Sequence, residues 1–287
     1  MADKSYRVHY FQTTVGDSHL KFRDTLTALH PQGHTGVLKN LGVKEILGRK
    51  YQLREFGKLP NSPLWAGVFC LLREDAPNKI DLADKEQSLD LDPGDRLVEK
   101  CHFLYDLKAD ILVWQLNVQA CWPGKVSMYL GELLNQKVEL LSILDAESLK
   151  RLLTGDIKTF ELKVARPAAV PNATPTWNQD AFDLMRSVDG ANIKINVSAG
   201  TGHLKKVTVA NILGWARSSE YTKTLKVQME GDREVIDLLA NRITGFVITK
   251  LVGHYPEKSA VISALRENYT TKGPEIIKAI SSTSGDS

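Results

Sequence analysis

The stretch that decides the fold is Lys100-Cys101-His102-Phe103-Leu104-Tyr105-Asp106, followed four residues later by Ile111-Leu112-Val113-Trp114-Gln115. Both runs are rich in aromatic and β-branched residues, which favour strands. The short polar segment between them has the length of a hairpin turn. We therefore expect two antiparallel strands in the middle of the chain, which form sheet core rather than a catalytic centre.

Strand patterns prevail before this hairpin, whereas helix and strand patterns alternate after it. The sequence thus predicts an α+β protein with a sheet-rich N-terminal domain, which contains the central hairpin, and a C-terminal β-α-β domain. Residues 166–175, with three prolines and three alanines, are typical of a linker. The expected parts are a sheet-rich N-terminal domain (1–122), a connecting β-α-β unit (123–165), a C-terminal α/β domain (176–280) and a disordered tail (281–287).

Capping residues and periodicity predict the ends of several helices and strands. Asp145 is expected to cap a helix that Gly155 ends, and Thr208 to cap a helix that continues through Arg217. The other expected helices are 17–29, 177–188, 259–269 and 274–280. The expected strands include 6–13, 49–56, 64–72, 157–165 and 192–197.

The composition is that of a soluble globular protein, with a net charge of +3 and 43% hydrophobic residues. The longest apolar runs are too short to cross a bilayer, and the start has no apolar region of the kind found in signal peptides. We expect a cytoplasmic protein without membrane insertion. Cys70, Cys101 and Cys121 have no metal-site spacing, so we expect free buried thiols and neither a metal nor a cofactor.

Basic residues are concentrated in two segments, 39–58 and 205–226. Each segment has a local charge of +4, which favours an anionic partner. Basic groups bind phosphates without regard to sequence. The candidate nucleic-acid-binding residues are Arg49, Lys50, Arg54, Lys58, Lys205, Lys206, Arg217, Lys223 and Lys226.

Two alternatives to DNA binding remain open at this point. Glu161 and Lys163 lie two apart on an expected strand, so they share a face, and Asp145 precedes them. This order is typical of PD-(D/E)xK nucleases, which hold Mg²⁺. The second alternative is a protein-interaction module that uses the acidic loop 81–95 against a basic partner.

The hairpin and the residues after it resemble a diffuse group of bacterial and prophage proteins of phage exclusion and abortive defence, related to RexA and KwaB. The shared pattern is Phe103-Leu104-Tyr105, a polar turn, Ile111-Leu112-Val113-Trp114-Gln115, a helix ending near Leu134, and the later Ile236-Asp237-Leu238-Leu239. The resemblance implies a cytoplasmic, homo-oligomeric, DNA-associated protein of phage defence, with a second defence-system protein as a further partner. It brings no catalytic signature, so we expect a non-catalytic, sequence-nonspecific DNA-binding effector or sensor.

Overall fold

A computed structural model of the chain describes residues 3–15, 22–29, 39–75, 78–80, 84–88, 91–92, 95–167, 176–219, 221–252 and 255–281. The chain divides into two compact units, each assembled from separated segments. The first comprises Met1–Val8, Thr13–Val138 and Phe246–Arg266, and the second comprises His9–Gln12, Glu139–Gly245 and Glu267–Ser287. Helices and strands both contribute to the fold, so the predicted α+β class is confirmed.

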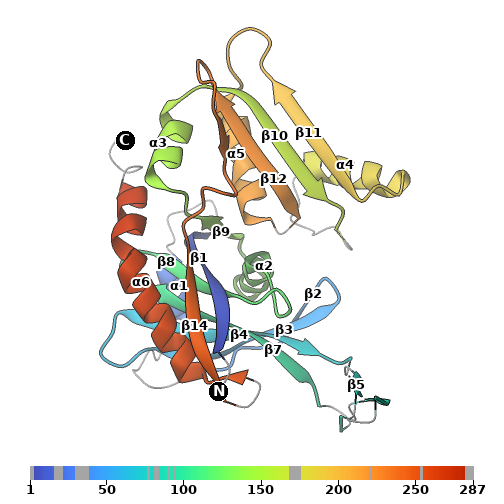
Figure 1. Ribbon diagram of the computed structural model, residues 1–287, viewed down its shortest axis with the longest axis vertical. Coiled ribbons are helices and arrows are strands. Elements are labelled where there is room, and N and C mark those ends of the chain that lie inside the picture. Colours follow the sequence, from blue (N-terminus) through green and yellow to red (C-terminus); the bar gives the residue numbers. More distant parts are fainter. Residues whose placement is uncertain are drawn as a thin grey trace. The chain divides into compact units, whose positions relative to one another are not determined.

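The larger sheet has nine strands, most of which belong to the first unit (Figure 1). Its order is β15-β14-β1-β8-β7-β4-β3-β2, and β9 pairs with β1 off this path. The strands are β1 (Asp3–Val15), β2 (Lys44–Ile46), β3 (Arg49–Lys58), β4 (Leu64–Arg73), β7 (Leu97–Asp106), β8 (Ile111–Leu116), β9 (Val138–Ser142), β14 (Thr244–Val252) and β15 (Tyr255–Pro256). A separate two-stranded ribbon consists of β5 (Asn78–Ile80) and β6 (Glu86–Ser88).

The central hairpin is confirmed as β7 and β8, which pair antiparallel with Phe103 opposite Trp114. The two rings stack with centroids 6.1 Å apart. Leu104 and Trp114 are completely buried, as expected for the middle of a core. Gly67 on β4 lies opposite Phe103, and a Cβ at this glycine would come within 2.6 Å of the Phe103 ring. The absence of a side chain at position 67 therefore lets this aromatic ring pack flat on the sheet.

The helix α2 (Pro123–Leu134) packs on the first unit's sheet through Tyr129. The Tyr129 ring meets Phe69 edge-on, with centroids 5.2 Å apart. Its hydroxyl donates to the Gly42 carbonyl at 2.7 Å and accepts from the Leu53 N–H at 3.2 Å. Burial raises the pKa of Tyr129 to about 12. The phenol is therefore a neutral anchor of the core.

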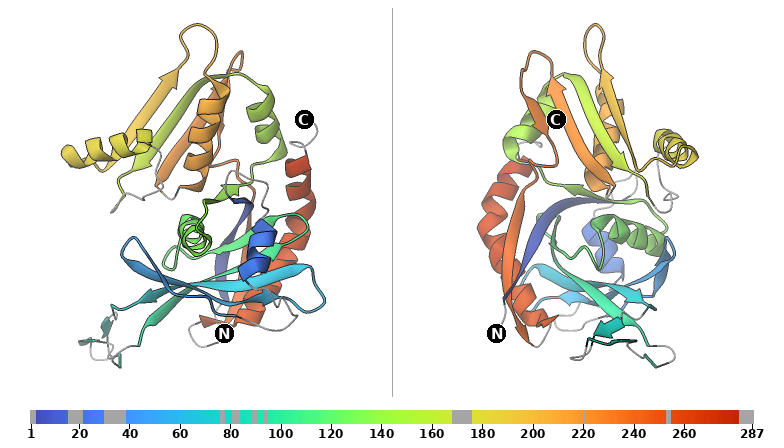
Figure 2. Two further views of the ribbon diagram at one scale, coloured as in Figure 1. Left: turned by 180° about the vertical axis from the view of Figure 1, so that it is seen from behind. Right: turned by 45° about the vertical axis from the view of Figure 1, so that its right-hand side comes forward.

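A four-stranded antiparallel sheet, in the order β11-β10-β12-β13, forms the centre of the second unit. Its strands are β10 (Ile157–Ala165), β11 (Asn192–Ser198), β12 (Thr222–Met229) and β13 (Val235–Asp237). The helices along this part of the chain are α3 (Ala146–Thr154), α4 (Thr176–Ser187) and α5 (Lys206–Ser218). Seen from behind, α4 and α5 lie over the same face of the sheet (Figure 2).

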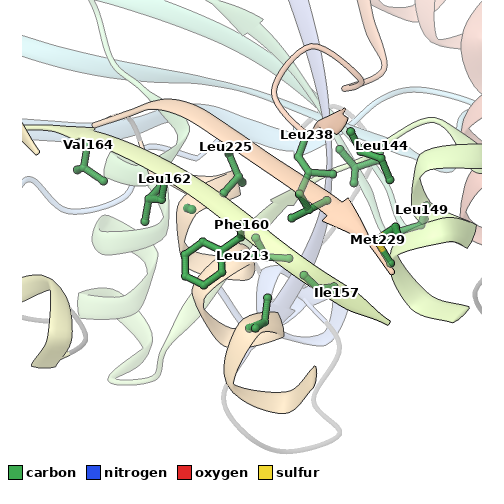
Figure 3. Packing of buried hydrophobic residues seen from close by; sticks show 14 of the residues in the cluster. Leu144, Leu149, Ile157, Phe160, Leu162, Val164, Leu213, Leu225, Met229 and Leu238 are labelled. Atoms are coloured by element: carbon green, nitrogen blue, oxygen red, sulfur yellow. The ribbon is translucent and has the colours of Figure 1, made fainter. Parts of the chain in front are cut away.

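Alternation along β10 explains this arrangement. Phe160, Leu162 and Val164 are buried, while the residues between them are partly exposed. Side chains two apart in a strand share a face, so these three form an apolar stripe. Figure 3 shows the stripe packed with Leu213 of α5 and Leu225 of β12, within one hydrophobic cluster. The helices therefore cover the apolar face, and the polar side chains are left on the other.

Helix caps agree with the predictions at α3 but not at α5. Asp145 accepts a hydrogen bond from the Ser148 N–H at 2.9 Å, which confirms it as the N-cap, and Gly155 follows the last turn. Thr208 is not a cap, because α5 begins two residues earlier, at Lys206. Lys205 occupies the N-cap position without a side-chain hydrogen bond. The Val209 N–H donates to the Lys205 carbonyl at 3.1 Å, so the first helical hydrogen bond already spans Thr208, and the buried Val209 side chain holds this turn on the core.

The last helix, α6 (Lys258–Ser281), is one element where two were predicted, at 259–269 and 274–280. Pro274 lies inside it. A proline removes one helical hydrogen bond, but its fixed φ is compatible with a helix. Tyr269 before the proline and Ile276 and Ala279 after it are all buried, so packing holds both flanks in one helix.

Other predicted segments fall partly outside the described residues. Within the predicted helix 17–29, the structure describes α1 (Phe22–Leu29), and residues 17–21 lie outside the described set. Most of the expected linker (168–175) and the tail beyond Ser281 also lie outside the described set. Within the described residues, no helix combines the length and apolar character needed to span a membrane.

Candidate nucleic-acid interface

One face of the four-stranded sheet is turned away from α4 and α5. Among the described residues of the second unit, no helix covers it (Figures 1 and 2). We call it the open face and define it by three residues from each of three strands. These are Thr159, Glu161 and Lys163 of β10, Lys194, Asn196 and Ser198 of β11, and Thr224, Lys226 and Gln228 of β12.

The strand register arranges these side chains in three rows across the sheet. The rows are Lys194–Lys163–Thr224, Asn196–Glu161–Lys226 and Ser198–Thr159–Gln228. Opposite residues of paired strands have Cβ atoms about 5 Å apart, so the lysines of neighbouring strands are close. All nine residues are polar or charged, and none is aromatic.

Within these nine residues three lysines and one glutamate give a net charge of +2, and Asp237 of β13, opposite Lys226 on the same face, lowers the local balance to +1. Glu161 pairs with Lys194 at an Nζ–Oε2 distance of 2.9 Å, and the Lys194 side chain is 50% exposed. A pair this exposed is worth well under about 1 kcal/mol and opens readily. Lys163 and Lys226 form no ion pair with any residue whose placement the structure gives. At least two ammonium groups are therefore available to an anion.

The second unit has further exposed cations outside the open face. Lys223 is exposed on β12, next to the register shift that follows Lys163. Lys205 is exposed at the start of α5, where the positive end of the helix dipole adds to its charge. Lys206 begins α5, but its side chain lies outside the described set. Three of the predicted positions, Lys205, Lys223 and Lys226, are thus exposed or partly exposed in the second unit.

Arg217 does not belong to this surface. Its Nη2 donates to the Ser142 carbonyl, and its own carbonyl accepts from Arg242 Nη2 at 2.7 Å. Burial, together with the nearby Arg242 charge, lowers the pKa of Arg217 to about 10. The guanidinium fastens the end of α5 to β9, so we remove Arg217 from the candidate interface.

The basic residues of β3 are surrounded by acidic groups. Lys50 pairs with Glu74 at 2.5 Å. Arg49 and Lys50 line an open hollow of about 910 Å³, together with Arg73 and four acidic residues. The acidic members are Glu45, Glu74, Asp75 and Glu99. Carboxylates thus outnumber cations in the hollow, which does not suit a polyanion.

A further carboxylate, Glu55, lies among the remaining basic residues of β3. Lys258 donates to the Glu55 carboxylate and, with Lys100 and Arg54, holds the pKa of Glu55 below its usual range. Lys58 lies at the end of the strand, opposite Trp65. The two basic segments of the sequence are therefore not equivalent in the folded protein.

The nuclease residues are only partly brought together. Glu161 and Lys163 share the open face, as their spacing predicts. The Asp145 carboxylate, however, caps α3, and Glu161 is paired with Lys194. Within the described ranges, no group of three or more His, Cys, Asp or Glu side chains is placed to hold a metal ion.

Nucleophilic groups are also placed for packing. All three cysteines are buried, and none of them forms a disulfide. Burial raises the pKa of Cys70 to about 11, which disfavours the thiolate. Burial likewise lowers the pKa of His102, whose Nδ1 lies 2.7 Å from Gln115 Oε1. Cys70 and His102 are thus both buried in the sheet, where burial disfavours their charged forms.

Sequence reasoning missed Lys194, the third lysine of the open face. Polar and apolar residues alternate in Asn192-Ile193-Lys194-Ile195-Asn196, which predicts a strand with one solvent-exposed face. Charge counted along the chain overlooks it, because Lys194 is an isolated cation. Only the register places it beside Lys163.

Comparison with curated proteins gives no match. A family model does match, over residues 1–275. Its description is "Family of unknown function (DUF6731)". Because the match covers both units almost completely, the chain belongs to the DUF6731 family.

Proposed function

We propose that this protein binds the phosphate backbone of DNA through the open face, without sequence preference and without cleaving the DNA. One observation carries the proposal. Lys163, Lys194 and Lys226, from three neighbouring strands, lie on a sheet face that no described helix of the unit covers. Lysines placed on phosphates release counterions, which is the main source of sequence-independent affinity.

The uncharged neighbours of these lysines support the same partner. Asn196, Ser198, Thr159, Thr224 and Gln228 carry hydroxyl or amide groups that can donate to phosphate or sugar oxygens. A phosphate backbone is therefore offered charge from the lysines and hydrogen bonds from the residues between them.

The lack of an aromatic side chain on the open face indicates how the DNA is held. Proteins that grip single strands stack exposed bases on aromatic rings. With none among the nine residues, affinity rests on the backbone, and a duplex, which has the higher charge density, is favoured. Lysines on a flat sheet face do not provide the paired hydrogen bonds that recognise base edges in the major groove.

No specific observation favours the two alternatives. The nuclease needs Asp145 as a metal ligand, yet this carboxylate caps α3. Much of the acidic loop 81–95 lies outside the described residues. A role in phage defence, a homo-oligomeric state, a partner from a defence system and a cytoplasmic location stay predictions.

Fluorescence anisotropy with labelled duplex and single-stranded DNA tests the proposal directly. We expect duplex binding that weakens steeply between 50 and 200 mM salt, by roughly 40- to 150-fold if three or four phosphates are contacted. Unrelated duplexes of equal length should bind equally, and gels should show intact DNA with and without Mg²⁺. Absence of binding at low salt would contradict the proposal, and Mg²⁺-dependent fragments would support the nuclease instead.

A further inference from the structure

The strand β14 has an apolar row that its own unit leaves exposed. From Phe246 to Val252 its residues alternate, and Val247 and Thr249 are buried. Phe246, Ile248 and Val252 point to the opposite face and are 59%, 67% and 68% exposed. The Arg7 guanidinium lies 5.6 Å from the Phe246 ring centroid, and Lys250 separates Ile248 from Val252 on this face. Adjacent apolar side chains that are more than half exposed are still unusual on a surface without a partner.

The same strand lies at an edge of the nine-stranded sheet. Its inner neighbour is β1, and its outer neighbour is β15, which pairs only with Leu251 and Val252. Pro256 lacks an N–H and ends that pairing. Among the described strands, none pairs with the outer edge of Thr244–Lys250. Every second residue of this segment therefore directs its N–H and C=O outward.

An open strand edge is complementary to another strand. The edge segment is symmetric about Val247, which allows it to pair with its own copy. In an antiparallel pair centred on Val247, Phe246 of one chain stands opposite Ile248 of the other. Thr244 then stands opposite Lys250, so no like charges face each other.

We propose that a second copy of this chain pairs with β14, antiparallel and centred on Val247, and so joins the two nine-stranded sheets in a twofold dimer. The same patch then meets itself, as twofold symmetry requires. Cross-strand pairs of Phe246 with Ile248 cover the exposed apolar row, and the outward backbone groups gain partners. The inference is independent of the proposed DNA binding, because it uses a different sheet.

Sedimentation velocity over a concentration series tests the dimer. We expect the wild type to shift towards a dimer as its concentration rises, and Ile248→Asp to remain a monomer at every concentration. Val188→Asp is the matched control, because Val188 is also 68% exposed but lies beyond the end of α4. It should dimerise as the wild type does. A wild type that stays monomeric at high concentration, or an Ile248→Asp variant that dimerises normally, would overturn the proposal.

Cross-linking tests the register and does not depend on Ile248→Asp folding well. Phe246→Cys and Ile248→Cys are prepared separately and oxidised mildly to disulfides, alone and mixed, because a disulfide needs Cβ atoms about 4 Å apart and does not reach diagonal neighbours at about 7–8 Å. We expect a cross-linked dimer mainly from the mixture, because residue 246 stands opposite 248 of the partner. Cross-linking of Ile248→Cys alone, or of neither sample, would contradict pairing centred on Val247.

Discussion

The basic residues of β3 and the lysines of the open face differ in how many carboxylates lie near them. On β3, Lys50 contacts Glu74, and Arg54 lies near Glu55, which already holds Lys258. On the open face, Lys163 has Lys194 and Thr224 as cross-strand neighbours, and Lys226 lies between Glu161 of β10 and Asp237 of β13 without an ion pair to either. In sequence, the β3 region is the more basic of the two in number of cations. In the folded chain, carboxylates outnumber cations in the hollow beside β3, whereas the nine residues of the open face carry one carboxylate for three lysines, and we propose DNA binding there.

The largest effect is expected from damage to the core beneath the open face. Leu162→Ala removes a fully buried side chain from the second unit's cluster, and should lower the free energy of unfolding by about 2–5 kcal/mol. Chemical denaturation measures this loss. DNA binding should disappear as the second unit unfolds on warming.

Leu104→Ala is the matched control in the first unit, because Leu104 is equally buried. It should destabilise the protein to a similar extent, but binding at low temperature should persist. If Leu104→Ala removes binding and Leu162→Ala does not, DNA contacts the first unit, and the comparison between the two regions is reversed.

A smaller effect is expected from charge reversal on the open face. Lys226→Glu removes one phosphate contact and places a carboxylate beside Glu161. We expect DNA affinity to fall about five- to tenfold at 0.1 M salt, because one contact contributes roughly 0.9 to the logarithmic salt slope. Anisotropy titrations measure the change. Lys58→Glu on β3 is the control, and an equal loss in both variants would remove the distinction between the regions.

Glu161→Gln separates DNA binding from the nuclease alternative. The substitution removes the one negative charge of the open face and releases Lys194. We expect DNA affinity to rise about two- to threefold. This increase is smaller than the effect of one full phosphate contact. A nuclease that uses Glu161 as a metal ligand would instead lose Mg²⁺-dependent cleavage, so gel assays of wild type and variant decide between the two.

The smallest effect is expected at Lys50. Its ion pair with Glu74 is solvent-exposed on both sides, so Lys50→Ala should change the free energy of unfolding by less than about 1 kcal/mol. DNA affinity should change less than twofold. A loss comparable to that of Lys226→Glu, measured in the same titration, would show that the β3 cations do contact DNA.

Local chemistry made several elements predictable from the sequence. The hairpin followed from two apolar runs around a polar turn, and the start of α3 from an aspartate whose carboxylate meets the Ser148 N–H. Strand β10 followed from alternation and agrees with the structure at both ends. In each case residues adjacent in sequence are sufficient to specify the structure.

Features that depend on distant contacts were not predictable. The helix α6 continues through Pro274 because Ile276 and Ala279 pack, and the sequence gives the proline but not the packing. Arg217 was taken for a surface cation, yet its guanidinium meets a carbonyl 75 residues away. Lys194 and Lys163 meet only through strand register. The candidate site is thus a product of the fold rather than of a motif.

The most direct test of the account is the salt dependence of duplex binding in two triple variants. One is Lys163→Ala/Lys194→Ala/Lys226→Ala on the open face, and the other is Arg49→Ala/Lys50→Ala/Arg54→Ala on β3. We expect the first to reduce the slope of log affinity against log salt by about 2–3, and the second by less than about 1. An unchanged slope in the open-face variant, with a large fall in the β3 variant, would contradict the assignment of DNA binding to the open face.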